Sequence, residues 1–191
     1  MTRLILTVAA LMAGAGVTAA HAADYCGVTM DQRNAAPASL TGAWAGKVRS
    51  GMMVGPDGKP QAMTADEEDG LEIMIKADGT GLSMEEAYDF FPAVALTAFT
   101  VEVMSEPDFA LPGESPLGAA ELLAPEVLTA GLSCNAADLP QFVADVPMDD
   151  AASATFRLFA LTPDQLVLVI KGEGGGKTAR AVFDLDRRPE N

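Results

Sequence analysis

Apolar and polar side chains alternate over several short stretches of this chain. Trp44 and Val48 fall on one side of the first stretch, and Ile73 and Ile75 fall on one side of the second. A period of two is typical of a β-strand with one face towards a core. The turn signal Asp78-Gly79 follows the second stretch and predicts a hairpin with a further strand starting near residue 80. Another strand is predicted over 97–103.

The C-terminal third has the clearest strand pattern. Residues 156–161 and 166–170 form two apolar runs, and the turn between them has Pro163 at its favoured second position. After a glycine-rich loop, residues 179–186 alternate again, with Ala181 and Phe183 on the apolar side. This third therefore predicts a three-stranded antiparallel meander.

The glycine-rich loop looks like a phosphate-binding loop but has the wrong spacing. In that motif four residues separate the first glycine from Gly-Lys-Ser/Thr. Here Gly176-Lys177-Thr178 would need a glycine at position 171, which is a lysine. The loop also precedes an alternating strand, whereas a phosphate site needs a helix N-terminus. We interpret the loop as a hairpin tip.

Residues 105–150 interrupt the alternation. The segment is rich in Ala, Leu and Pro, and Ser115-Pro116 is typical of the start of a helix. A further short helical piece is predicted over 138–144. We expect a partly helical insertion within one domain spanning 23–191, since the segment is too short and too often broken by proline to form its own core. Residues 23–39 have no clear period and are expected to be extended.

The N-terminal residues have the pattern of an export signal. Arg3 precedes an apolar run, and Ala20-His21-Ala22 supplies the small residues before a cleavage site. The run is shorter than the roughly 20 apolar residues of a membrane span. We predict a signal peptide over 1–22, cleaved after Ala22, and a periplasmic or secreted mature protein. No later stretch is apolar enough to predict a membrane span.

Charge and histidine content narrow the classes of function. The chain carries a formal net charge of −15, which disfavours binding to nucleic acid. Its single histidine, His21, would leave with the signal peptide. Histidine-dependent triads, zinc sites and acid–base chemistry would then be excluded from the mature protein.

Cys26 and Cys134 are the two cysteines of the chain. In an exported protein such a pair predicts a disulfide, and neither residue has the Cys-x-x-Cys neighbour of a redox site. Closing so long a loop is worth about 4–5 kcal/mol in the chain-entropy model.

No cofactor, metal site or catalytic group is predicted. The acidic run 66–69 lacks the ladder of a calcium loop and is expected to be solvated. The pair Met52-Met53 is interpreted as packing. An enzyme would have to use carboxylates, hydroxyls or lysines alone, and no spacing selects any of them. We therefore expect a non-enzymatic protein.

Two short motifs resemble those of lipocalins. Gly42-Ala43-Trp44 is similar to the Gly-x-Trp element of the first lipocalin strand. The tail from Phe183 to Arg187 resembles the last strand, in which an arginine caps the barrel base and stacks over that tryptophan. The resemblance covers 40–50, 70–82 and 155–188, and implies a mainly β fold with an antiparallel meander closed into a barrel. Only six or seven strands are recognisable in the sequence, so a partly open barrel or a β-sandwich is an alternative.

A lipocalin-like barrel implies a small hydrophobic ligand. The positions expected to line its cavity are Trp44, Val48, Ile73, Ile75, Leu168, Ala181 and Phe183. Cys26, Cys134 and Arg187 are expected to be structural. The alternative function is an interaction or inhibitor module for an exported hydrolase or envelope partner, with the arm 23–39 and the loop 51–69 as contact surfaces. Dense packing of the interior by large side chains would favour this alternative.

Overall fold

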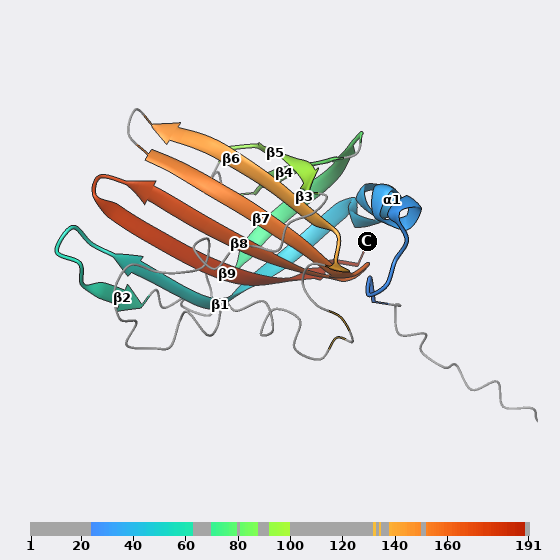
Figure 1. Ribbon diagram of the computed structural model, residues 1–191, viewed down its shortest axis with the longest axis horizontal. Coiled ribbons are helices and arrows are strands. Elements are labelled where there is room, and N and C mark those ends of the chain that lie inside the picture. The colour runs from blue at the N-terminus through green and yellow to red at the C-terminus, as the bar shows by residue number, and fades with distance from the viewer. Residues whose placement is uncertain are drawn as a thin grey trace, which may run out of the picture.

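The structure is a computed structural model, and it describes residues 24–62, 70–79, 81–87, 92–99, 132, 134, 138–149 and 152–189. Within these residues the fold consists of one helix and nine strands (Figure 1). The elements are α1 (Met30–Leu40), β1 (Gly42–Val54), β2 (Pro60–Ala62), β3 (Leu71–Asp78), β4 (Gly81–Glu86), β5 (Val94–Phe99), β6 (Gln141–Asp149), β7 (Ala152–Thr162), β8 (Gln165–Gly174) and β9 (Lys177–Arg187). The predicted signal peptide and the candidate helix start at Ser115-Pro116 lie outside the described residues.

The strands form a closed antiparallel barrel. Each strand from β3 to β9 pairs with its sequence neighbour, and β1 pairs with both β3 and β9, which completes a ring of eight strands. The short strand β2 is an extra strand that pairs with the far half of β1. The expected mainly β, antiparallel barrel is therefore confirmed, and the barrel is closed rather than a sandwich.

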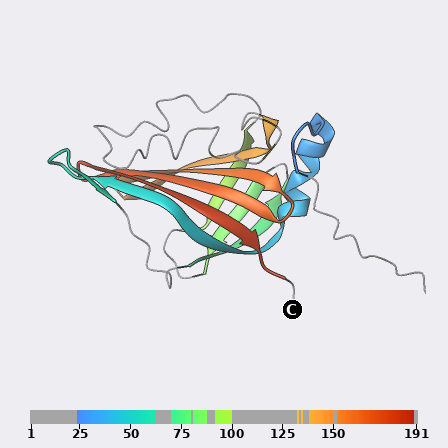
Figure 2. The ribbon, with the colours of Figure 1, turned by 90° about the horizontal axis from the view of Figure 1, so that it is seen from below.

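The two ends of the barrel differ. Near α1, at the end we call the base, β1 pairs with β3 over Gly42–Gly46, and β6 pairs with β5 over Gln141–Val143. Beyond these ladders β1 and β6 to β9 continue past β3, β4 and β5 towards the opposite end, which we call the flared end (Figures 1 and 2).

Residues 23–39 were expected to be extended, and this prediction is wrong for residues 30–39. They belong to α1, which starts with a capping box in which Thr29 and Gln32 each bond the backbone amide of the other. Ala36 and Leu40 are buried against the base of the barrel. The arm before the helix is also fixed, because the amide of Tyr25 donates to the carbonyl of Leu161 at 2.9 Å.

The expected helical piece over 138–144 is also wrong. The chain there enters β6, a strand paired with β7 over nearly its whole length. Phe142 and Val146 face the barrel interior, while Pro147 lies near the strand's end, where the ladder with β7 has an irregularity. The proline and the alanine-rich surroundings hide the alternation of β6 in the sequence. The rest of the predicted insertion, up to residue 131, lies outside the described residues.

The hairpins predicted at Asp78-Gly79 and at the glycine-rich loop are both confirmed. Gly79 has a φ of 60° in the turn between β3 and β4. Gly175 and Gly176 have φ values of 58° and 73° at the tip between β8 and β9. Because a strand follows this tip, the glycine-rich loop lacks the helix N-terminus that a phosphate-binding loop needs.

Candidate binding site inside the barrel

The base of the barrel is sealed by Trp44 and Arg187. Trp44 is fully buried, and its indole Nε1 donates to the carbonyl of Leu40 at 3.0 Å. The guanidinium carbon of Arg187 lies 4.5 Å from the centre of the Trp44 ring, which confirms the predicted stacking.

Arg187 also joins three chain segments at the base. Its guanidinium donates to the carbonyls of Ser39, Thr41 and Pro163. These carbonyls belong to the end of α1, to Thr41 just before β1, and to the turn between β7 and β8. Charge-assisted bonds of this kind are stronger than neutral ones. The side chain therefore holds the helix, the first strand and the β7–β8 turn together.

Gly42 makes this arrangement possible. Its φ of 142° is unfavourable for other residues, and a Cβ at this position would lie 2.8 Å from Nη1 of Arg187. The glycine of the Gly-x-Trp element is thus required by the approach of the arginine.

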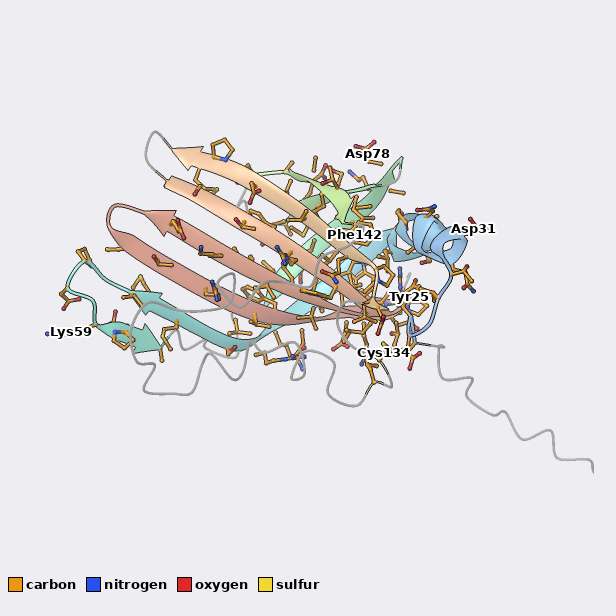
Figure 3. All side chains as sticks on the ribbon, viewed as in Figure 1. Tyr25, Asp31, Lys59, Asp78, Cys134 and Phe142 are labelled. Atoms are coloured by element: carbon orange, nitrogen blue, oxygen red, sulfur yellow. A yellow bond between two sulfur atoms is a disulfide. The ribbon has the colours of Figure 1, made fainter. Side chains whose placement is uncertain are left out.

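The disulfide lies at the same end of the molecule. Cys26 and Cys134 are bonded, with Cα atoms 5.4 Å apart, which confirms the predicted bridge. Both cysteines pack against the barrel core. Figure 3 labels Cys134 at the end of the barrel where α1 lies. The bridge therefore ties the N-terminal arm to the chain just before β6.

The residues expected to line a cavity all lie on the inner face, on β1, β3, β8 and β9. All of them except Val48 belong to one cluster of buried residues, and Val48 packs against that cluster. Trp44, Ile75 and Leu168 have no exposed surface. Together with Phe142 they fill the interior near the base. These side chains form a packed core there, and their contact with a ligand stays a prediction.

Towards the flared end most inner side chains are small, although the large side chain of Phe156 lies at the level of Ala144 and Ile170. The small side chains come from β6 to β9, and three of these strands were predicted from the sequence while β6 was missed. The set comprises Ala144, Val146, Ala154, Ile170, Gly172, Ala179 and Ala181. Several of them are only partly buried, in contrast to the residues of the base.

Two glycines on the inner face show the same difference. A Cβ at Gly46, near the base, would lie 2.7 Å from Cδ2 of Leu185, so the space beside it is filled. A Cβ at Gly172, near the flared end, would have no atom within 4 Å. The inner face is therefore open beside Gly172, whereas it is closely packed beside Gly46.

Among the described residues, this set of inner side chains of β6 to β9 at the flared end carries no charge. Charged residues on the same strands face outwards, where Nε of Arg49 donates to Asp184 at 3.0 Å and Lys171 pairs with Glu173. Glu86 does face inwards at the end of β4, but its buried carboxyl group already has an interaction partner. The flared end is thus suited to an uncharged, apolar group.

A hollow lies beside the start of β1. Its volume is about 200 Å³, and its lining includes Glu72, Met74, Glu85 and Arg188. The charged groups are paired, Arg188 with Glu72 and Lys76 with Glu85. Within the described part of the chain, no group of three or more acidic, cysteine or histidine side chains could hold a metal ion.

Comparison with protein-family models and with curated proteins finds no match to this chain. None of the helices in the described ranges is long and apolar enough to cross a membrane.

Proposed function

We propose that this protein is an exported, non-enzymatic binding protein, similar to lipocalins, that holds a small uncharged hydrophobic ligand in the flared end of its barrel. The observation that carries the proposal is the contrast between the packed base and the open space beside Gly172. An eight-stranded barrel is wide enough for one small ligand. The ligand would contact Ala154, Ile170 and Ala181 rather than Trp44 or Ile75.

Two further observations support the lipocalin-like and exported character. The stacking of Arg187 on Trp44 at a sealed base is the arrangement that the lipocalin resemblance implies. The disulfide suits an oxidising compartment, as does the signal-like pattern over 1–22.

Binding is tested with purified chain 23–191 and a fluorescent fatty-acid or retinoid probe. Gly172→Leu places a side chain in the open space and should weaken probe binding at least about tenfold, because the probe and the leucine compete for one volume. Glu173→Leu is the matched control, since neighbouring residues of a strand face opposite sides. The proposal fails if no probe binds the unaltered chain, or if Gly172→Leu and Glu173→Leu bind the probe with equal affinity.

The second candidate is an interaction module, and the dense packing of the base favours it. The arm and α1 are fixed against the barrel, whereas the hairpin of β1 and β2 extends beyond the flared end (Figure 1). Its tip carries Lys59, whose side chain is 84% exposed. This hairpin is therefore the better contact surface of the two expected from the sequence.

The interaction module is tested by capture of periplasmic proteins on the immobilised chain. A variant with residues 55–59 replaced by Gly and Ser should lose a partner that the unaltered chain retains. Replacing Gly175-Gly176 by Asn-Gly at the neighbouring tip is the control. If all three chains captured the same proteins, or if none of them captured any protein, the interaction-module hypothesis for this hairpin would be refuted.

A further inference from the structure

One edge of β6 lacks a partner strand near the flared end. The ladder between β5 and β6 ends at the pair Thr97 and Val143, whereas the ladder between β6 and β7 continues to Asp149. Residues 94–96 of β5 pair with β4 on their other side. Among the described residues, no strand therefore pairs with this side of β6 beyond Val143 (Figure 1). We call residues 144–147 the open edge of β6.

The hydrogen-bond pattern determines which backbone groups point out of the open edge. In an antiparallel ladder, residues that bond the partner strand alternate with residues whose N–H and C=O point the other way. The amide of Ala160 on β7 donates to the carbonyl of Pro140 at 3.0 Å. Every second residue from Pro140 therefore bonds β7, and Asp145 and Pro147 point their backbone groups the other way. The carbonyl of Val143 agrees with this pattern, because it accepts a side-chain hydrogen bond from β5 at 3.2 Å.

Pro147 suits this position. A proline has no N–H, so within a sheet it is tolerated where its nitrogen faces an unpaired edge. The open edge thus offers the N–H and C=O of Asp145 and the C=O of Pro147. Both side chains are exposed, and the side chain of Met148 beside them is 40% exposed. An edge of this kind is a template for an added strand.

We propose that the open edge of β6 binds an extended peptide segment of a partner protein, which adds an antiparallel strand with alternating apolar and basic side chains. This strand would take the place beside β6 that β5 leaves. The proposal goes beyond the binding of a small ligand and does not depend on it. The surface is also distinct from the hairpin of β1 and β2.

The inner side of the open edge favours apolar side chains in the partner. Ala144 and Val146 face the interior and are only partly buried. Residues of an added strand that lie opposite them point to the same side, because directly opposite residues of two strands share a face. Val146 lies at the level of Gly172, with Ala154 between them. Apolar groups of the partner would therefore cover Val146 and point towards the open space beside Gly172.

The outer side of the open edge favours a basic side chain. Asp145 is exposed there, and its Oδ1 accepts from Oγ1 of Thr155 at 2.7 Å, which orients the carboxylate. A carboxylate accepts several hydrogen bonds, so Asp145 can also face a lysine or arginine of the added strand. The formal net charge of −15 likewise favours a basic partner over an acidic one.

A second copy of this chain is a poor occupant of the open edge. Two such edges would bring two Asp145 carboxylates together, and each would lack an N–H at Pro147. A charge and a proline on an edge strand are devices that prevent pairing between copies. They leave room for a strand whose charge is opposite.

Hydrogen exchange of the chain 23–191 tests the open edge itself. The amide of Asp145 should exchange at least about tenfold faster than those of Ala144 and Val146, which bond β7. If the amide of Asp145 were as protected as its two neighbours, the edge would already be occupied, and the proposal would be overturned.

Peptide binding tests the chemistry of the partner. The probe is a short fluorescein-labelled peptide of alternating valine and lysine, and the control peptide has glutamate in place of lysine. Fluorescence polarisation should show at least about fivefold tighter binding of the lysine peptide. This peptide should also slow exchange of the Asp145 amide at least about tenfold and leave that of Ala144 unchanged. Failure of the lysine peptide to bind, or to slow exchange at Asp145, would overturn the proposal.

Variants of Asp145 separate the charge from the backbone contact. Asp145→Asn keeps the N–H and should weaken binding of the lysine peptide about two- to fivefold. Asp145→Pro also removes the N–H and should weaken binding at least about tenfold. Asp145→Lys should reverse the preference, so that the glutamate peptide binds more tightly. Asp78→Asn, at the exposed end of β3, is the control and should bind as the unaltered chain does.

Two results with these variants would contradict the assignment. One is equal binding of the lysine peptide by the unaltered chain and all Asp145 variants. The other is an unchanged preference in Asp145→Lys, which retains the N–H and keeps the test informative if the proline variant does not fold. Fluorescence of Trp44 verifies that each variant is folded, because this residue is buried at the base.

Discussion

Arg187→Met should remove much of the stability of the barrel base. The guanidinium group makes hydrogen bonds to the carbonyls of Ser39, Thr41 and Pro163 and stacks on Trp44. A hydrogen bond to a charged group contributes about 1.5–3 kcal/mol, and the stacking about 0.5–2 kcal/mol. The carbonyls at the surface regain water after the substitution. The salt bridge to the exposed Asp164 adds little. We expect a loss of about 3–4 kcal/mol of unfolding free energy.

Urea unfolding followed by tryptophan fluorescence measures this loss. Trp44 is the only tryptophan of the chain, so the signal reports on the base itself. The midpoint should fall with an unchanged m-value, and Tm should drop by about 6–15 °C for a chain of this size. Arg188→Met is the matched control, because Arg188 is more exposed and its one ion pair joins it to Glu72. That variant should cost less than about 1 kcal/mol. Equal losses in the two variants would refute the role assigned to Arg187.

Two further changes test the same end of the molecule. Replacing Cys26 and Cys134 by Ser should lower the unfolding free energy by about 3–5 kcal/mol, because the bridge closes a separation of 108 residues. Urea unfolding measures this loss. If a reducing agent does not cause the same loss in the unaltered chain, the bridge is not its cause. Gly42→Ala should cost about 2–3 kcal/mol because of its positive φ and the contact with Arg187. Calorimetry of G42A in the Arg187→Met background separates the two causes. The part of the stability loss that comes from the contact with Arg187 should be absent there, and the part that comes from the positive φ should remain.

The strand pattern predicts most of the barrel, because alternation reports directly which face of a strand is buried. It identifies the hairpin at Asp78-Gly79 and the meander of β7, β8 and β9. It misses β6, where Pro147 and small residues weaken the contrast between the two faces. It also misses α1, which contacts the barrel mainly through Ala36 and Leu40 and so lacks a long apolar stripe. The capping box of Thr29 and Gln32 was the available signal for this helix.

The candidate site is only partly predictable for a related reason. Alternation places Trp44, Ile75 and Ala181 on the inner face, but it carries no information on depth along the barrel axis. Depth depends on which neighbours fill the space, and Gly46 and Gly172 are indistinguishable by residue type alone. The bulge in β1 adds a second difficulty, since it moves Met52 to the outer face against the simple alternation.

The pairing of β1 with β9 sets the order in which this chain can fold. The ring joins residues near position 44 to residues near position 187, so it cannot close before the last strand has been synthesised. Contacts of such sequence separation make folding slow, in the range of milliseconds to seconds. A chain that ends before β9 would leave β1 and β8 with unpaired edges and would be prone to self-association. The native barrel can therefore form only after β9 has been synthesised.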